Sequence, residues 1–220
     1  MANLLLGVTG SVAAIKTPEL FAELRQRGHQ VKVVATQASL YFFDPAALNP
    51  ARSDRDPQLV VLDEDEWPGR NCGGRYRRTD DVLHIELRRW ADLLVIAPLD
   101  ANTLAKLANG LCDNCLTCIW RAWEPTRPVV LAPAMNTLMW EHPLTARHLR
   151  QLARDAGAVN DLHQTLVGEL PAWINEHSRS LRIVPPVSKQ LACGDVGFGA
   201  LASPAAIGQA VDDVLSSAQP

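Results

Sequence analysis

The sequence predicts an α/β fold in which helices cover both faces of one parallel sheet. The chain has 220 residues, 47% of them hydrophobic, which is enough to bury one sizeable core without a second domain. Short apolar runs without polar alternation recur along it, as is typical of strands buried on both faces. Longer amphipathic segments separate these runs. The expected architecture is a single-domain, doubly wound, three-layer sandwich of the Rossmann or flavodoxin-like type, with a parallel sheet.

The apolar runs give the expected strands, and the segments between them give the expected helices. Strands are expected at residues 4–8, 31–36, 93–98 and 128–133. Helices are expected at residues 13–27, 101–109, 114–123 and 204–217. The segment DDVLHIELRRWAD predicts a further helix, with Asp80 or Asp81 as its N-cap. Ser203 is expected to cap the last helix, because Pro204 suits the first helical position.

Two segments interrupt this alternation. Residues 63–80 are charged and contain glycine, and residues 157–182 show no clean periodicity. Both are expected to be surface excursions of one domain that spans residues 1–220. Two interpretations of the second segment stay open, a disordered stretch and an added surface helix around PAWINEH.

Composition limits the classes of partner. A formal net charge of -3 and a pI of about 6.1 disfavour a broad electrostatic hold on nucleic acid. No apolar run approaches the roughly 18 residues of a membrane span, and MANLLLGVTG has neither the basic region nor the cleavage site of a secretory signal. We therefore expect a cytoplasmic protein with a small-molecule or protein partner, bound to neither nucleic acid nor membrane.

The five cysteines suggest reduced thiols rather than a disulfide framework. CDNCLTC spaces Cys112, Cys115 and Cys118 three residues apart, which superficially suggests an iron–sulfur run. The spacing matches only part of the ferredoxin pattern, and no fourth Cys-Pro follows. Three small thiols along a buried helix face are expected instead, and no metal site is expected.

The ends of the first two strands are candidate ligand contacts, because open α/β sheets bind ligands beyond the carboxyl ends of their strands. Residues 9–11 (TGS) and 36–39 (TQAS) are both hydroxyl-rich, and each opens a helix. Neither forms a GxGxxG motif or a P-loop. Two interpretations stay open: an ordinary turn with Ser11 as N-cap, or two neighbouring turns that share one phosphate.

Two later strand ends present side-chain amides. After LLVIAP, Asp100 can cap a helix and Asn102 can offer an amide to a planar heterocycle. Capping alone explains Asp100 but does not require Asn102. After PVVLAP, a Pro-Ala-Met-Asn turn presents Asn136, whose amide can bind a carboxylate. The alternative is a capped turn with Met139 and Trp140 in the core.

Two side chains could carry chemistry of their own. His84 shares a helix face with Arg88, away from the apolar stripe, although a lone helical histidine is more often a surface or packing residue. Cys193 lies in ACGDVGFGA. This segment predicts either a mobile flap that carries a thiol, or a glycine-rich turn in which the cysteine is incidental.

Four motifs follow one another along the chain: GSVAAIK, VLHIELRRWADLLVIAPLDANTLAKLANGLCDN, PAMNTLMW and LACGD. Together they resemble the phosphopantothenoylcysteine decarboxylases, which belong to the homo-oligomeric flavin-containing cysteine decarboxylases. The likeness covers nearly the whole chain apart from the two excursions. It implies the single-function form typical of eukaryotes, because no synthetase domain accompanies the motifs. The implied reaction is FMN-dependent decarboxylation of 4'-phosphopantothenoylcysteine to 4'-phosphopantetheine in coenzyme A biosynthesis.

The resemblance also implies a role for each candidate residue. The catalytic residues would be His84 and Cys193, with Asn136 orienting the substrate carboxylate. Asn136, Met139 and Ala192 would contact substrate. The family assembles as a trimer with each flavin between neighbouring subunits, so a homotrimer is expected. The implied FMN contacts are Ser11, Val12, Ala13, Thr36, Ser39, Phe42, Asp100, Ala101, Asn102, Thr103 and Ala134.

The implied chemistry explains why these groups are needed. Direct loss of carbon dioxide from a cysteine would leave an unstabilised carbanion. Oxidation of the carbon that bears sulfur gives a thioaldehyde, from which carbon dioxide leaves to form an ene-thiolate. His84 is expected to remove the thiol proton, since imidazole changes charge near neutral pH. Cys193, as a mostly protonated thiol, is expected to donate a proton to the ene-thiolate.

Other functions remain open beside this one. A regulatory flavin-binding protein of the phosphatase-inhibitor kind often lacks one catalytic element, whereas this chain keeps both His84 and Cys193. A peptidyl-cysteine decarboxylase would use the same chemistry, and only resemblance separates it. A flavin prenyltransferase shares the fold and cofactor, but the PAMN turn together with His84 and Cys193 disfavours it.

Overall fold

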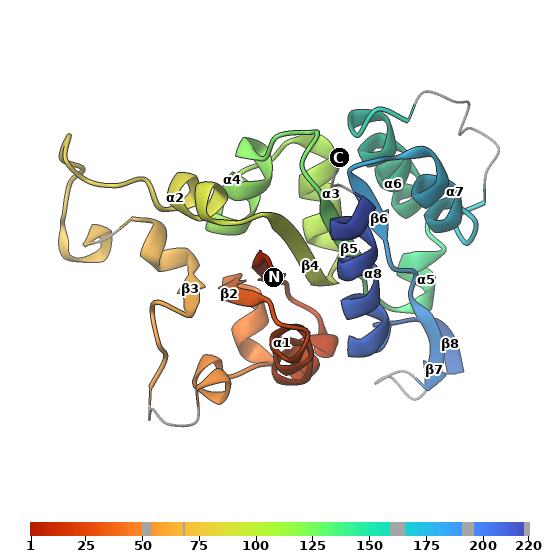
Figure 1. Cartoon of the computed structure of the whole chain (residues 1–220), viewed down its shortest axis with the longest axis horizontal. Coiled ribbons are helices and arrows are strands. Elements are labelled where there is room, and N and C mark those ends of the chain that lie inside the picture. Colours follow the sequence, from red (N-terminus) through yellow and green to blue (C-terminus); the bar gives the residue numbers. More distant parts are fainter. Residues whose placement is uncertain (50–53, 68, 159–165, 191–195, 218–220) are drawn as a thin grey trace.

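The computed structural model describes residues 1–49, 54–67, 69–158, 166–190 and 196–217 (Figure 1). In this part of the chain, one fully parallel sheet has the strand order β3-β2-β1-β4-β5-β6. Its order reverses between β1 and β4, which is the doubly wound Rossmann arrangement, so the predicted fold class is confirmed. The strands are β1 (Asn3–Val8), β2 (Gln30–Ala35), β3 (Val60–Leu62), β4 (Leu93–Leu99), β5 (Val129–Pro133) and β6 (Leu181–Ile183), and a separate antiparallel hairpin contains β7 (Val187–Gln190) and β8 (Val196–Ala200).

Most helices coincide with segments that the sequence predicts as helical, but the helices at Thr137–Trp140 and Pro143–Asp155 were not predicted. The α-helices are α1 (Thr17–Gln26), α2 (Leu83–Trp90), α3 (Ala101–Asn109), α4 (Cys115–Ala122), α5 (Thr137–Trp140), α6 (Pro143–Asp155), α7 (Leu170–His177) and α8 (Pro204–Ser217). Short 3-10 helices are η1 (Val12–Lys16), η2 (Gln37–Tyr41), η3 (Pro45–Leu48), η4 (Asp63–Glu66) and η5 (Arg70–Cys72). The helices predicted at 101–109 and 204–217 have those bounds, whereas the one predicted at 13–27 is divided into η1 and α1.

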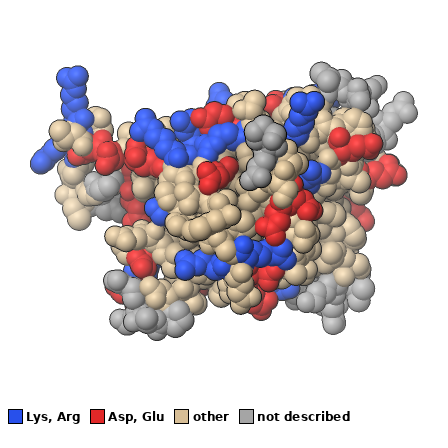
Figure 2. Space-filling view, viewed as in Figure 1, with Lys and Arg blue, Asp and Glu red and all other residues tan. Residues whose placement is uncertain are grey.

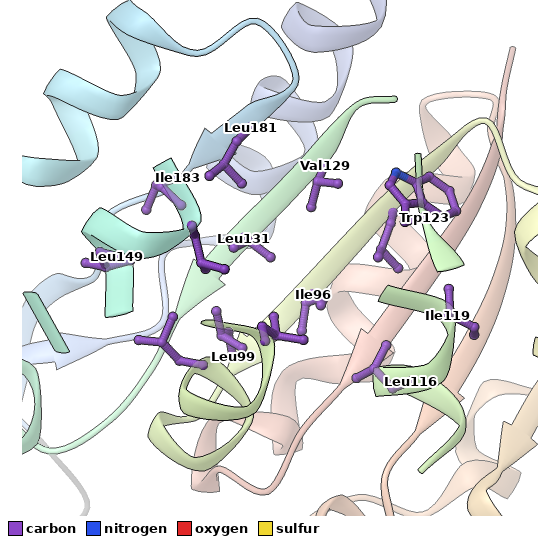
Figure 3. Close-up of a cluster of buried hydrophobic side chains, with 14 of the residues drawn as sticks. Ile96, Leu99, Leu116, Ile119, Trp123, Val129, Leu131, Leu149, Leu181 and Ile183 are labelled. Carbon is purple, nitrogen blue, oxygen red and sulfur yellow. The ribbon is translucent and has the colours of Figure 1, made fainter. Parts of the chain in front are cut away.

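Alternate residues of each strand face two separate layers of helices. In β1, Leu4 and Leu6 pack into the layer of α1 and α8, while Leu5 points into the layer of α2, α3, α4, α6 and α7. Figure 3 shows the second layer, where Ile96 and Leu131 of the strands lie among helix side chains. Each fully buried leucine contributes about 1.5–3 kcal/mol of hydrophobic stabilisation. Burial on both faces therefore fixes the sheet and the positions of its strand ends.

Both predicted surface excursions contain structural parts, which corrects the sequence analysis. In residues 63–80, η4 places Glu66 in the interior with 4% of its surface exposed. In the described part of 157–182, α7 buries Leu170 and Ile174, and β6 pairs with β5. The expected helix around PAWINEH exists, but it belongs to the core rather than the surface. A one-turn helix and a three-residue strand are too short to produce a periodic signal.

Two predicted helix caps have different outcomes. Ser203 caps α8 as predicted, because its Oγ accepts from the amide of Ala206 at 3.2 Å. Neither Asp80 nor Asp81 caps α2, whose N-cap is Val82 without a side-chain hydrogen bond. Asp80 instead accepts from the amide of Arg77 at 2.7 Å, so a local turn occupies the carboxylate.

On the face of the molecule shown in Figure 2, neither positive nor negative side chains dominate. Figure 2 shows lysine and arginine side chains interspersed with aspartate and glutamate on that face. Among the described residues, no helix is long and apolar enough to cross a membrane.

Candidate functional site

The turns that follow β1, β2 and β4 meet at the carboxyl edge of the sheet. Thr9 is fully buried, and its Oγ1 donates to the carbonyl oxygen of Pro98 and accepts from the amide of Asp100, both at 2.8 Å. A Cβ added to Gly10 would lie 2.7 Å from the Cβ of Ala38 and 3.3 Å from Oδ2 of Asp100. Only glycine therefore allows the three turns to approach this closely.

Two predicted caps hold these turns. Ser11 Oγ accepts from the amide of Ala13 at 3.3 Å, so Ser11 is the N-cap of η1. The same hydroxyl donates to the carbonyl oxygen of Ala134 at 3.2 Å, which brings the turn after β5 to the turn after β1. Asp100 Oδ1 accepts from the amide of Thr103 at 2.7 Å and caps α3. The capping interpretation is confirmed for both residues, and it leaves their backbone turns exposed to a ligand at the sheet edge.

The hydroxyls after β2 are directed inward. Thr36 Oγ1 donates to the carbonyl oxygen of Val8 at 3.2 Å, and Ser39 Oγ donates to that of Thr36 at 2.7 Å. Both residues are buried, and Phe42 is half-buried against the core layer of α1 and α8. The two turns do lie side by side, but the hydroxyl protons of Thr36 and Ser39 already have backbone acceptors. Any ligand would meet the lone pairs of these hydroxyls and the surrounding amides.

A small polar cavity of about 260 Å³ opens between the turns that follow β2 and β4. Asn102 is exposed at the edge of this cavity. The hydrogen bond that caps α3 joins Asp100 and Thr103, so capping does not involve Asn102, as the sequence analysis expected. Lys106 is the basic residue of the lining, and its Nζ forms an ion pair with Oδ2 of Asp113 at 2.7 Å. The lining comprises Thr36, Gln37, Ala38, Asp63, Asp100, Asn102, Thr103, Lys106, Asp113 and Asn114.

A second cavity of about 450 Å³ adjoins the first and reaches Glu66, the hydrogen-bond partner of His84. The two cavities share Gln37, Asp63, Asp113 and Asn114. Glu66 lines the second cavity, and its Oε1 lies 2.5 Å from Nδ1 of His84. Sequence analysis selected His84 but missed Glu66, because an acidic residue in a DEDE run is normally solvated. No signal in the sequence separates Glu66 from its acidic neighbours.

Burial governs the ionisable groups around these cavities. Burial raises the pKa of the Asp63 carboxyl, although backbone hydrogen bonds from Gln37 and Cys115 oppose it. One oxygen of Asp63, Oδ1, is buried without a partner among the described residues. Burial also raises the pKa of the Cys115 thiol well above its usual range and that of Cys118 to about 11, and in both the charge of Glu66 is the next cause. Both cysteines therefore remain thiols at neutral pH.

The predicted stripe of three buried thiols is wrong. Cys115 is buried, whereas Cys118 is half-buried and Cys112 is exposed. The reason is that α4 begins at Cys115, with Asn114 as its N-cap, so Cys112 lies outside the helix. Among the described residues, no group of three or more histidine, cysteine, aspartate or glutamate side chains could hold a metal ion.

The turn after β5 presents Asn136 as the N-cap of α5. Its Oδ1 accepts from the amide of Leu138 at 2.9 Å. Trp140 is buried, but Met139 is 48% exposed, so the interpretation with both residues in the core is wrong for Met139. Met139 is exposed because α5 has little more than one turn and buries only the side that carries Trp140.

The hairpin of β7 and β8 docks beside Asn136. The amide of Met135 donates to the carbonyl oxygen of Gly199 at 2.9 Å, and the rings of Trp140 and Phe198 lie 6.3 Å apart. In the sequence, Ala192 and Cys193 fall between the two strands of this hairpin. Both residues, and the predicted flap, lie outside the described residues.

A larger hollow of about 940 Å³ lies at the opposite edge of the sheet, next to Met1 and Gln30. None of the turns that follow β1, β2 and β4 lines this hollow. Ligands of open α/β sheets bind at the carboxyl edge of the sheet, where those turns lie. The two adjoining polar cavities are therefore the candidate site despite their smaller size.

The fold and the strand-end turns define a doubly wound α/β protein whose candidate ligand site lies at the carboxyl edge of the sheet. The Flavoprotein family model matches residues 1–216, and the chain belongs to this family.

Individual relatives are more specific. A curated Arabidopsis thaliana protein named phosphopantothenoylcysteine decarboxylase is 48% identical over 210 residues, covering 93% of this chain and 81% of that protein. A solved PPC decarboxylase mutant, complexed with pantothenoylaminoethenethiol, is 44% identical with a TM-score of 0.75, covering 97% of this chain and 98% of that one. The FMN binding protein AtHal3 is also 44% identical, with a TM-score of 0.73, covering 100% and 99%.

Proposed function

We propose that this chain catalyses the FMN-dependent decarboxylation of 4'-phosphopantothenoylcysteine to 4'-phosphopantetheine, a step of coenzyme A biosynthesis. The observation that carries the proposal is the 44% identity, over nearly the whole of both chains, to the PPC decarboxylase complexed with pantothenoylaminoethenethiol. That compound is an enethiol, the class of intermediate expected when carbon dioxide leaves an oxidised cysteine. The similarity to an FMN binding protein supports FMN as the cofactor.

The residues at the convergent turns fit FMN. The close approach at Gly10 leaves a backbone cradle without side chains. The first amides of α3, those of Ala101 and Asn102, have no acceptor within the helix, and helix N-termini favour anions. When bound, FMN supplies the acceptor for two electrons from the carbon beside sulfur. We assign its contacts to Ser11, Val12, Ala13, Thr36, Ser39, Phe42, Asp100, Ala101, Asn102, Thr103 and Ala134.

The chain's own side chains handle protons and orientation. His84 takes the proton of the substrate thiol, and its hydrogen bond to Glu66, which lines the second cavity, supports this role. Asn136 orients the substrate carboxylate, and Met139 and Ala192 contact the substrate. A carboxylate only accepts hydrogen bonds, so in this proposal the contact comes from Nδ2 of Asn136, while its Oδ1 caps α5. Cys193 donates a proton to the ene-thiolate.

The assembly in this proposal is a cytoplasmic homotrimer with FMN between subunits. Apolar side chains exposed close to the FMN turns support it. Ile15 of η1 is 60% exposed and Leu138 of α5 is 77% exposed, and the Ser11–Ala134 hydrogen bond joins the two regions. Soluble monomers rarely expose large contiguous apolar patches, so this surface suits a second copy of the chain.

Turnover by the purified chain tests the reaction. The expected protein is yellow from bound flavin, and it converts phosphopantothenoylcysteine to a product lighter by one carbon dioxide, as measured by mass spectrometry. Bound flavin without turnover would favour the regulatory protein. Turnover of a peptide ending in cysteine, with none of phosphopantothenoylcysteine, would favour the peptidyl-cysteine decarboxylase.

The Cys193→Ser variant tests the last proton transfer. A serine hydroxyl is a far weaker acid than a thiol, so the oxidised, decarboxylated enethiol should accumulate in place of phosphopantetheine. Mass spectrometry of the quenched reaction distinguishes the two products by two hydrogens. Cys72→Ser is the control, because Cys72 is exposed on η5 and is expected to leave the product unchanged. Formation of phosphopantetheine at the parent rate by the Cys193 variant would remove its assigned role.

A further inference from the structure

We infer that Glu66 is a positioning residue for His84, which holds the imidazole so that Nε2 is the nitrogen that accepts a proton. The inference rests on the proposed function, because it assumes that His84 takes the proton of the substrate thiol. Glu66 lies eighteen residues before His84 and belongs to none of the motifs that carry the family resemblance. The tertiary structure alone brings the two side chains together.

The hydrogen bond between the two side chains determines which ring nitrogen is available. Nδ1 of His84 lies 2.5 Å from Oε1 of Glu66. A carboxylate only accepts hydrogen bonds, so Nδ1 is assigned as the nitrogen that carries the hydrogen. In a neutral imidazole the other nitrogen, Nε2, then holds a lone pair. Nε2 has no hydrogen-bond partner among the described residues, and the side chain is 19% exposed, so that lone pair can reach a bound thiol.

The burial of Glu66 indicates that its carboxylate needs a positive partner. Its side chain is 2% exposed, and Oε2 is buried without a partner in the described part of the chain. A buried carboxylate is costly unless an opposite charge compensates it. Among the described residues, no lysine or arginine forms an ion pair with Glu66, and His84 is the side chain that does so when protonated. His84 is therefore the basic side chain placed to compensate this carboxylate.

The ionisable groups next to Glu66 and His84 do not add a second negative charge beside the imidazole. Cys115 of α4 approaches Glu66, but burial first, and then the charge of Glu66, raises the pKa of this thiol and keeps it neutral. Burial also raises the pKa of the Asp63 carboxyl on the same short helix. Glu66 is thus the carboxylate placed to stabilise a positive His84.

The proton transfer assigned to His84 balances with this arrangement. The S–H bond of the substrate breaks, its electron pair stays on sulfur, and the proton forms a bond to Nε2. The resulting imidazolium has its positive charge beside Oε1 of Glu66. Such a contact is stronger in a site shielded from water than at the surface. Without the carboxylate, the ring can carry its proton on Nε2, where it cannot act as the base.

The Glu66→Gln variant of the flavin-loaded enzyme tests the inference. Glutamine has no charge, and its amide can donate to Nδ1, which favours the wrong tautomer. We expect kcat to fall by about 10²-fold or more, within the range of general acid–base catalysis, with little change in KM or flavin content. Glu66→Asp keeps the charge at a shorter reach and should recover part of the rate. Glu64→Gln removes an exposed carboxylate from the same helix and serves as the matched control.

A second measurement is independent of turnover. Nitrogen-15 NMR of histidine-labelled, flavin-free protein reports which ring nitrogen of His84 carries the proton. The parent and Glu64→Gln should show the Nδ1–H tautomer, whereas Glu66→Gln should show a larger fraction of the Nε2–H form. A purely structural role for Glu66 would not shift this tautomer balance.

Combining variants separates this inference from the proposed function. If Glu66 acts through His84, Glu66→Gln should not lower the residual rate of His84→Asn any further. A parent-like kcat in folded, flavin-loaded Glu66→Gln, or an unchanged tautomer, would overturn the inference. If Glu66→Gln does not fold, Glu66→Leu replaces it, because leucine removes the carboxylate and leaves an apolar side chain in the buried position, and a parent-like kcat of that variant overturns the inference instead. A parent enzyme without turnover, or a fully active His84→Asn, would refute the proposed function, while the tautomer measurement would still decide the role of Glu66.

Discussion

Thr9 joins the ends of two neighbouring strands through one hydroxyl group. Its Oγ1 donates to the carbonyl of Pro98 and accepts from the amide of Asp100, and the residue is fully buried. Both backbone groups flank the turn that leads into α3. Thr9 is absent from the FMN contacts that the family resemblance implies, yet its side chain holds two of the strand-end turns together. The sequence placed Thr9 in a hydroxyl-rich turn but did not reveal this bridging role.

Replacing Thr9 by valine should destabilise the protein. The methyl group fits the space of the hydroxyl but leaves the carbonyl of Pro98 and the amide of Asp100 without this partner. We expect the free energy of unfolding to fall by about 2 kcal/mol, measured by urea titration with saturating FMN. Thr9→Ser keeps the hydroxyl and should lose only about 0.8 kcal/mol. Equal stability of the valine variant and the parent would contradict the bridging role.

The hairpin of β7 and β8 flanks, in the sequence, the segment that contains Cys193, which the proposal assigns to proton donation. Its base is fixed where Gly199 accepts a hydrogen bond from Met135, next to Asn136. Gly199 has a φ of 148°, and a Cβ there would overlap the carbonyl oxygen of Met135. The element therefore requires glycine both for its backbone conformation and for the close approach to the turn after β5.

The Gly199→Ala variant tests this dependence. The added methyl group collides with backbone rather than with a flexible side chain, so the hairpin must move away from Asn136. We expect kcat/KM to fall on the order of 10²-fold, since displacements of about 1 Å have this effect on reacting geometry. Gly168→Ala is the matched control, because its new Cβ would have no atom within 4 Å. Parent-like kinetics of Gly199→Ala would show that docking of the hairpin is not needed.

Elements differ in how well the sequence predicted them. The helices at 101–109 and 204–217 were predicted with the observed bounds, because each has a strong local start signal in Asp100 or Ser203. The strand β6 and the helix α7 were missed as core elements, since their burial comes from contacts with β5 and α6 that are remote in sequence.

At the scale of the whole molecule, exposed apolar side chains point to self-association. Leu138 is 77% exposed on α5, beside the 48% exposed Met139 that the proposal assigns to substrate. Leu138→Glu places a charge on this surface, so we expect the trimer to dissociate and flavin retention to fall. Light scattering coupled to size exclusion measures the mass.

The matched control for this surface is Leu166→Glu, at a residue that is 68% exposed before α7. It should leave both mass and flavin content unchanged. A Leu138→Glu protein with the parent mass would place the interface elsewhere, and a parent protein that is monomeric would refute the trimer.

The sequence by itself determined the four central strands β1, β2, β4 and β5, the helices α2, α3, α4 and α8, and the turns at the ends of these strands. These follow from hydrophobic runs and capping residues, which act over a few neighbouring positions. It also selected Asn136 as an amide that could bind a carboxylate, and it selected His84, whose role came from family resemblance.

Only the tertiary structure decided which side chains meet. It paired Glu66 with His84 across eighteen residues, joined Ser11 to Ala134, and placed Gly199 against Met135. It also separated Cys112 from Cys115, because the first lies outside α4 and the second is buried in the core. The physical reason is that the burial and partner of a polar group depend on the packing of the whole sheet and its helices, which no local pattern encodes.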